Sequence, residues 1–156
     1  MAVRDFDSFD HESHMKRAFE LAREAAERGD RPFGSVLVRD DDIVMEDSNR
    51  VVTENDIRRH PELHLAYRAA RGFDPETRAE LVMYTSTEPC SMCASGIQTA
   101  GLGRVAFSVS GEELAEIRGG EAGVSSTAIL GAETDVVAGV LNDAGRQIHR
   151  EYYGSE

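Results

Sequence analysis

The sequence predicts an α/β fold, a three-layer α/β/α sandwich around a mixed five-stranded sheet. Segments with helical periodicity alternate with short strand-like runs, in the order α-β-β-α-β-α-β-α-β-α. This order is typical of a sheet that is covered by helices on both faces. With 156 residues, the chain is expected to form one domain over residues 1–156.

Each predicted element has a signal of its own. Over residues 10–28, the apolar positions that fall on one helical stripe are Met15, Phe19, Ala22 and Ala25. Gly29 stands where that helix should end, and Pro61 suits the first turn of a helix over residues 61–71, closed by Gly72. The other predicted helices are 90–101, 112–118 and 142–153, and the predicted strands are 34–39, 43–47, 81–86, 104–108 and 135–138.

Three segments are predicted to form turns or loops. The acidic triplet at residues 40–42 predicts a hairpin turn between the first two strands, and the polar residues 49–59 predict a loop. Residues 119–131 are rich in Gly, Ser and Ala and are expected to be the least structured part of the chain.

Charge limits the classes of partner. Asp and Glu number 29 against 17 Lys and Arg, a net charge of −12, and only Lys16 is lysine. An acidic surface repels phosphate backbones, so nucleic acid is a poor first choice of partner. An acid excess with so little lysine also resembles the proteins of salt-loving, halophilic organisms. In molar salt the Debye length falls to about 3 Å, and net charge then says less about partners.

Neither a membrane span nor a secretory leader is expected. The sequence holds no run of eighteen apolar residues, and its first thirteen residues are acidic where a signal peptide would be basic and then apolar. We therefore expect a cytoplasmic protein with no membrane partner.

The only two cysteines, Cys90 and Cys93, form a C-x-x-C pair rather than a disulfide framework. Such a pair is either a redox couple or two metal ligands. The segments His60-Pro61-Glu62 and Pro89-Cys90-Ser91-Met92-Cys93 each open a predicted helix. One imidazole and two thiolates make three zinc ligands and leave a fourth position for water.

Glu62 stands two residues beyond the predicted ligand His60. Zinc lowers the pKa of a bound water to about 7, and Glu62 could take that water's proton and hand it to a leaving amine. The pattern H-x-E…P-C-x-x-C is the signature of zinc deaminases, and both halves are present in order.

Other interpretations of the same residues stay open. His64 could complete a closed, structural zinc site, or the cysteines could form a thioredoxin-like redox pair. A zincin is disfavoured because its Glu must directly follow the first His. A non-catalytic, zinc-stabilised binding scaffold is the alternative outside enzymes, and it has no need of Glu62.

The motifs resemble the cytidine deaminase-like superfamily, in the branch of cytosine, guanine and tRNA adenosine deaminases with a CMP/dCMP-type zinc-binding domain. The resemblance extends over about residues 14–153, and its further motifs are Pro32-Phe33-Gly34, Asn49-Arg50 and Thr87-Glu88-Pro89. It implies that zinc is held by His60, Cys90 and Cys93, that Glu62 shuttles protons, and that the Asn49 side chain hydrogen-bonds the base. Family members usually carry Ala or Val where this chain has Pro61, which a helix start tolerates.

The resemblance implies a zinc-dependent hydrolase that releases ammonia from a free nucleobase or small nucleoside, with cytosine or guanine foremost. The alternative within the family is a tRNA adenosine deaminase. Phe33 would stack on the base or belong to the core. The resemblance also implies a homodimer, with a seam that we place at residues 101–118. The side chains left without a firm role are Glu88, Glu112, Glu113, His64, Tyr152, Tyr153 and the pair Arg58-Arg59, which could hold at most one phosphate.

Overall fold

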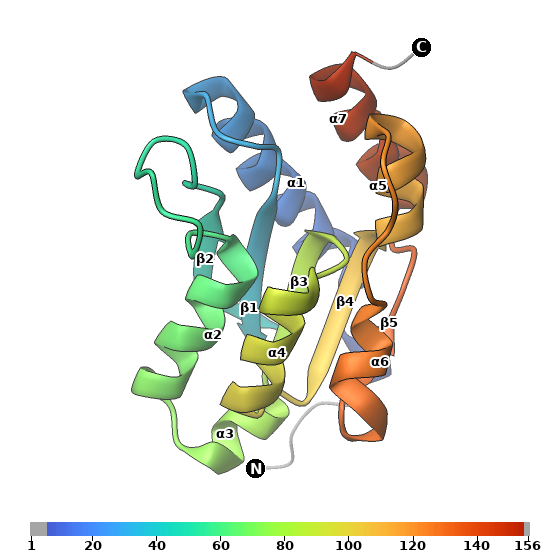
Figure 1. The fold of residues 1–156 in the computed structure, drawn as a ribbon. Coiled ribbons are helices and arrows are strands. Elements are labelled where there is room, and N and C mark those ends of the chain that lie inside the picture. The colour runs from blue at the N-terminus through green and yellow to red at the C-terminus, as the bar shows by residue number, and fades with distance from the viewer. Residues whose placement is uncertain (1–5, 155–156) are drawn as a thin grey trace.

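A mixed five-stranded sheet forms the middle of the molecule in the computed structural model, which describes residues 6–154 (Figure 1). The strands are β1 (Gly34–Arg39), β2 (Asp42–Ser48), β3 (Val82–Thr87), β4 (Arg104–Val109) and β5 (Asp135–Val137). They lie in the order β2-β1-β3-β4-β5, with β1 antiparallel to both of its neighbours and β3, β4 and β5 parallel. The predicted fold class is confirmed. The N-terminal residues 1–5, part of the segment in which no leader is expected, lie outside the described residues.

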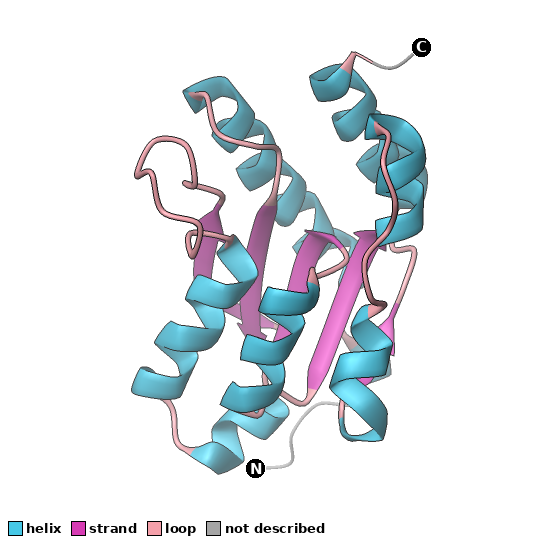
Figure 2. Cartoon of the chain, in the orientation of Figure 1, coloured by secondary structure: helices cyan, strands magenta, loops and turns pink. Residues whose placement is uncertain are grey.

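Helices cover both faces of the sheet (Figure 2). The long helices are α1 (His11–Arg28), α2 (Pro61–Gly72), α4 (Ser91–Ala100) and α7 (Asn142–Tyr153), and the short ones are α3 (Pro75–Glu80), α5 (Gly111–Arg118) and α6 (Ser126–Leu130). Two 3₁₀ turns, Phe6–Ser8 and Gly131–Glu133, complete the described elements. None of the helices in residues 6–154 is both long enough and apolar enough to span a membrane.

Strand β1 divides the apolar core into two layers. Val36 and Val38 pack with Phe19 of α1 on one face of the sheet, whereas Leu37 packs with α2 and α4 residues, such as Leu65, on the other. Successive side chains of a strand point to opposite faces, so a central strand buried on both sides is apolar throughout. The continuous apolar run in β1 has this cause.

Helix α1 begins and ends where the sequence predicts. The side chain of Asp10 accepts a hydrogen bond from Ser13 N, and Gly29 closes the helix in the left-handed conformation at φ 98°. Gly34 at the start of β1 meets this helix closely, since a Cβ there would lie 2.3 Å from the carbonyl oxygen of Ala18. The glycine of the Pro32-Phe33-Gly34 motif is therefore required by the packing of α1 on the sheet.

Two of the α-helices in the described residues are missing from the sequence prediction. Residues 119–131, expected to be the least structured part, contain helix α6, whose first residue Ser126 donates its backbone N–H to the Glu88 carboxylate and whose Leu130 is buried. Residues 73–80, for which no element is predicted, contain α3, where Asp74 caps the helix by accepting from Thr77 N. Helix α6 escapes prediction because the carboxylate that stabilises its first turn lies 38 positions away in the chain. Helix α3 escapes prediction because it is only six residues long.

The topology brings four chain segments to one edge of the sheet. Residue Gly34 at the start of β1 pairs with Ser48 at the end of β2, and Thr87 at the end of β3 pairs with Val109 at the end of β4. The segments beyond these residues therefore emerge at the same edge. The first turns of α2 and α4 lie there too, at the upper end of the sheet in Figure 1.

Candidate active site

The first turns of α2 and α4 bring the predicted zinc ligands together. His60 is the N-cap residue of α2 and Cys90 that of α4, and the two helices pack side by side. The Sγ atom of Cys90 lies 3.7 Å from Nδ1 of His60, and the ligand atoms of His60, Cys90 and Cys93 all lie within 4.8 Å of one another. Within residues 6–154 no other group of three His, Cys, Asp or Glu side chains is placed to hold a metal ion.

Local backbone chemistry explains why these residues stand at helix starts. Pro61 occupies the first turn of α2, where a missing N–H costs nothing and its fixed φ suits the helix, so the departure from the usual Ala or Val fits the observed backbone. Neither His60 nor Cys90 uses its side chain to cap its own helix. Both side chains are therefore available to a ligand.

The donor set fits zinc. A tetrahedral zinc ion has Zn–N and Zn–S bonds of about 2.0–2.3 Å, which place neighbouring ligand atoms roughly 3.5–3.8 Å apart. The 3.7 Å between Sγ of Cys90 and Nδ1 of His60 lies in that range. One imidazole with two thiolates is a zinc donor set that leaves a fourth position. The three residues could hold such an ion.

Hydrogen bonds among the three candidate ligands favour a thiolate at Cys90. The Cys93 thiol and His60 together hold the pKa of the Cys90 thiol down to about 4. The same contact with Cys90, together with burial, raises the pKa of Cys93, and the hydrogen bond to Cys90 raises that of His60. Both cysteines are free thiols, Cys90 exposed and Cys93 buried.

Glu62 lies directly beside this cluster. It is buried with 5% of its surface exposed, although carboxylates are rarely buried without a counter-charge. Burial raises the pKa of Glu62 to about 7, the charge on Cys90 adds to this effect, and His60 opposes it. A carboxyl group that titrates near neutrality can both accept and release a proton at physiological pH.

Asn49 and Phe33 lie at the same edge of the sheet. Asn49 is buried and donates its backbone N–H to the carbonyl oxygen of Phe33. Arg50 N donates to Arg59 O at 3.0 Å, and this bond closes the base of the 50–59 loop. Asn49 directly precedes Arg50 and His60 directly follows Arg59, so the closed loop brings Asn49 close to His60. Phe33 is half-buried, with its ring 5.4 Å from that of His149.

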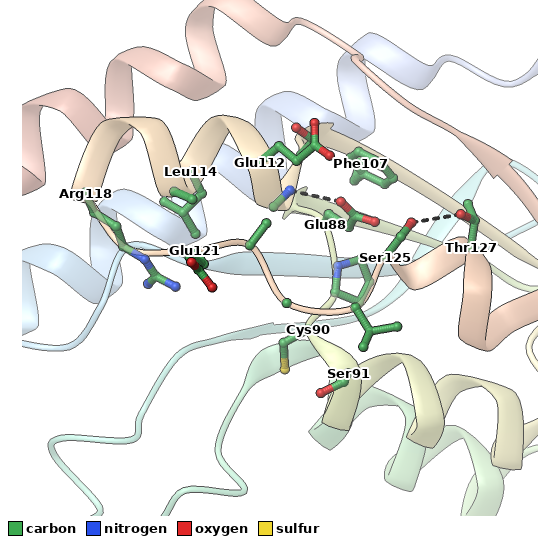
Figure 3. A pocket seen from close by; sticks show the side chains of 17 residues that line it. Glu88, Cys90, Ser91, Phe107, Glu112, Leu114, Arg118, Glu121, Ser125 and Thr127 are labelled. Atoms are coloured by element: carbon green, nitrogen blue, oxygen red, sulfur yellow. Dashed lines mark hydrogen bonds between the residues drawn. The ribbon is translucent and has the colours of Figure 1, made fainter.

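A pocket of about 380 Å³ adjoins the cluster at Cys90 (Figure 3). Its walls come from the start of α4, from α5 and from residues 121–125, so this segment lines the same pocket as Cys90 and Ser91. Charged side chains on the wall are Glu88, Glu112, Arg118 and Glu121.

The three glutamates to which the sequence assigns no firm role, Glu88, Glu112 and Glu113, differ in their contacts. The Glu88 carboxylate accepts hydrogen bonds from Gly111 N and from Ser126, so it joins the starts of α5 and α6 instead of orienting a ligand. Glu113 forms a capping box with Ser110 at the start of α5. Glu112 lines the pocket.

The other unassigned side chains have partners away from the cluster. His64 stacks on Tyr67 and is not part of the three-ligand group, so the described structure does not contain the closed, four-ligand site. Tyr153 stacks on His149, and Tyr152 is exposed. Arg58 pairs with Asp56, and Arg59 pairs with Glu54 and Asp47.

Sequence reasoning missed two groups near the site. His149 of α7, given no role from the sequence, is 1% exposed and shares a hydrogen bond of 2.6 Å with Thr87 Oγ1. Arg28 and Asp30, also not predicted, hold the turn that follows Asn49. Neither group belongs to a local motif, and only the fold brings them to the site.

This arrangement is what a hydrolase acting on a C–N bond requires: a place for an activated water and a carboxylate that moves protons. The chain belongs to the family described as MafB19-like deaminase, whose family model matches residues 9–127. The resemblance to the cytidine deaminase-like superfamily is thereby confirmed.

Three relatives show the range of named activities. A probable cytosine deaminase of Schizosaccharomyces pombe is 30% identical over 152 residues, covering 90% of this chain and 91% of the relative. A Bacillus subtilis guanine deaminase is 38% identical over 91 residues, 58% of each chain. A tRNA-specific adenosine deaminase of Agrobacterium fabrum is 28% identical over 139 residues, 89% of this chain and 91% of the relative.

Solved structures share the fold. A crystallised mutant protein in complex with 8-azaguanine superposes with a TM-score of 0.82 at 23% identity, covering 94% of this chain and 85% of that chain. At this identity the likeness supports the α/β/α fold alone.

Proposed function

We propose that this chain is a zinc-dependent hydrolytic deaminase that acts on a free nucleobase or a small nucleoside, with cytosine or guanine as the best candidates. One observation carries the proposal: the buried carboxylate of Glu62 lies beside the cluster of His60, Cys90 and Cys93. A scaffold would gain nothing from burying a carboxylate next to a thiolate, because desolvation and like charge both oppose it. The names of the cytosine and guanine deaminase relatives agree with this activity.

The chain's own residues divide the work of the reaction. Zinc held by His60, Cys90 and Cys93 would lower the pKa of a bound water to about 7. Glu62 accepts a proton from that water, the water oxygen bonds to the ring carbon that carries the exocyclic amine, and Glu62 delivers the proton to the adjacent ring nitrogen. Glu62 then carries the second proton of the water to the exocyclic amine, the C–N bond breaks, and ammonia leaves a ring carbonyl behind.

Asn49 supplies the proposed selection for a carbonyl-bearing base. Its Oδ1 accepts a hydrogen bond from Val51 N at 3.0 Å, which leaves the Nδ2 amide as the donor for a ligand. Cytosine and guanine each carry a ring carbonyl that can accept this bond, whereas adenine has none. Phe33, half-buried beside Asn49, offers its ring to the face of the base.

A tRNA substrate is the second candidate because several relatives are tRNA-specific adenosine deaminases. Phosphate binding needs cations that are free to reach the backbone. Here Arg58 and Arg59 pair with acidic side chains, and Arg146 of α7 pairs with Asp143 and Glu113. These pairs favour a small substrate over tRNA.

The test is ammonia release by the purified, zinc-loaded protein. The panel holds cytosine, guanine, adenine, their nucleosides and s-triazine analogues, and a parallel reaction holds tRNA that is then sequenced for inosine. We expect ammonia from cytosine, guanine or one of their nucleosides. Inosine in tRNA with no ammonia from any small compound would select the tRNA activity, and bound zinc with neither product would select the scaffold.

A further inference from the structure

A buried carboxylate lies behind the proposed base-contacting residue. Asp30, which follows helix α1, has no exposed side-chain surface. Its Oδ1 accepts hydrogen bonds from Val52 N at 3.1 Å and Thr53 N at 2.9 Å, and its Oδ2 accepts from Thr53 Oγ1 at 2.9 Å and Arg28 Nε at 2.7 Å. A carboxylate in this position is fully satisfied and fixes the turn at residues 51–53.

Arg28 extends the same network to Asn49 itself. Its Nη2 donates to Ser48 Oγ at 3.0 Å and to the carbonyl oxygen of Asn49 at 2.8 Å. A guanidinium presents several donors in a rigid plane, so one side chain can bind Asp30 and Asn49 together. Residues at the end of α1 therefore hydrogen-bond the chain both before and after the Asn49 side chain, at Ser48 and at residues 52–53.

We propose that Arg28 and Asp30 form a clasp that positions Asn49, and that they set base affinity through Asn49 without touching the base. This inference rests on the proposed function, in which the free Nδ2 of Asn49 donates to the base. Among residues 6–154 the Asn49 side chain has one hydrogen-bond partner, Val51 N, and Val51 directly precedes the two amides that Asp30 holds. If the turn at residues 51–53 moves, the partner of Asn49 Oδ1 moves with it and Nδ2 loses its direction.

The position of the clasp excludes a direct role in the reaction. Both carboxylate oxygens of Asp30 already accept hydrogen bonds from Val52, Thr53 and Arg28. Because the side chain is also fully buried, a bound base cannot reach it. These hydrogen bonds hold the pKa of Asp30 below its usual range in spite of burial, so it stays charged opposite Arg28. Replacing Arg28 would leave the buried Asp30 carboxylate without its counter-charge, and replacing Asp30 would leave the amides of Val52 and Thr53 without their acceptor, so the turn should move in either case.

A double-mutant cycle separates positioning from mere stability. Asp30→Asn keeps the shape but replaces one acceptor oxygen by an amide that repels Arg28. With the base that the ammonia screen identifies, we expect a loss in kcat/KM of about 10- to 100-fold, carried mainly by KM, as for other small misplacements of a binding group. In an Asn49→Ala background, Asp30→Asn should change kcat/KM by less than about twofold, because the residue being positioned is gone. Equal losses in both backgrounds would overturn the proposal.

A matched control uses a different ion pair of α1, one that joins it to β2. Arg17 of α1 donates to the Glu46 carboxylate of β2 from Nε at 2.6 Å, and neither of these side chains hydrogen-bonds residues 49–53. Arg17→Gln should leave kcat/KM within about twofold of the original protein. If Asp30→Asn fails to fold, Thr53→Val removes only the hydroxyl bond to Asp30 Oδ2 and should give a smaller loss with the same dependence on Asn49.

A second readout does not depend on any activity. In the zinc-loaded protein without substrate, hydrogen exchange should be slow at Val52 N–H and Thr53 N–H and at least tenfold faster after Asp30→Asn, with a shifted side-chain amide signal from Asn49. Unchanged exchange and an unchanged Asn49 signal would refute the clasp even if every base is deaminated. If no base is deaminated, the proposed function fails, and the exchange data alone decide whether the clasp exists.

Discussion

The Sγ atom of Cys90 lies 3.7 Å from Nδ1 of His60, although thirty positions separate the two residues in the chain. No local segment can bring these atoms together, because each belongs to a different helix start. Only the packing of α2 against α4 on the sheet forms the site. A metal that binds this pair binds the folded state, so its affinity adds to the stability of the fold.

Replacing Cys90 should therefore remove both metal and stability. We expect the original protein to contain one zinc per chain and Cys90→Ala to contain less than a tenth of that, with a clear fall in melting temperature. Elemental analysis and thermal unfolding measure the two effects. Ser91→Ala is the control, because Ser91 lies next to the ligand and its side chain is not part of the ligand cluster. A Cys90→Ala protein that keeps zinc and activity would contradict the ligand assignment.

Gly34 should tolerate no side chain. A Cβ at this position would lie 2.3 Å from the carbonyl oxygen of Ala18 and 2.6 Å from Ala22 N, so α1 must shift from the sheet. Overpacking of this kind costs about 1–3 kcal/mol of unfolding free energy or more. Chemical denaturation of Gly34→Ala measures this cost. Gly123→Ala is the control, with no atom near its added Cβ and an expected change below about 0.5 kcal/mol.

Equal stabilities of the two variants would show that α1 does not press on the start of β1.

His149 should make the fold sensitive to acid. Burial lowers the pKa of His149 to about 4, from 6.5 in the unfolded chain. As the pH falls, the unfolded state therefore takes up the proton before the folded state does. The stability that the neutral ring contributes is complete above pH 6.5 and is lost as the pH falls toward 4. Between pH 8 and pH 5 this group alone should cost about 2 kcal/mol.

The measurement is the unfolding free energy of the original protein and of His149→Gln at both pH values. The variant has no ring to titrate, so its loss between the two values should be about 2 kcal/mol smaller. Parallel losses in both proteins would mean that His149 is protonated in the folded state as easily as in the unfolded one.

The resemblance to the family predicts a homodimer, with its seam at residues 101–118. Light scattering at micromolar concentration should give twice the mass of one chain, both in moderate salt and in molar salt. A single-chain mass under both conditions would refute this prediction.

Much of the fold follows from local sequence signals. The predicted helix start at residue 10, the terminal Gly29 and the first-turn Pro61 agree with the observed helix ends within a residue. The predicted ligands His60 and Cys90 come together as well. Spacing along the chain predicts these features because helix caps and ligand motifs act over a few residues.

The features that were missed depend on partners far away in the chain. Helix α6 starts where Ser126 meets Glu88, 38 positions earlier, and the Arg28–Asp30 clasp holds residues about 20 positions later. His149 becomes a buried partner of Thr87 only after α7 has packed on the sheet. Contacts of this range leave no periodic or motif signal in a single sequence.

The most direct test of the proposed function is the rate of ammonia release by Glu62→Gln, measured with zinc content on the same sample. The amide keeps the size of the side chain but cannot carry a proton from water to ring nitrogen and amine. We expect this variant to fold, to hold one zinc per chain and to lose about 10²- to 10⁴-fold in kcat. A zinc-loaded Glu62→Gln protein that keeps more than a tenth of the original rate would contradict the role of Glu62 and the proposed function with it.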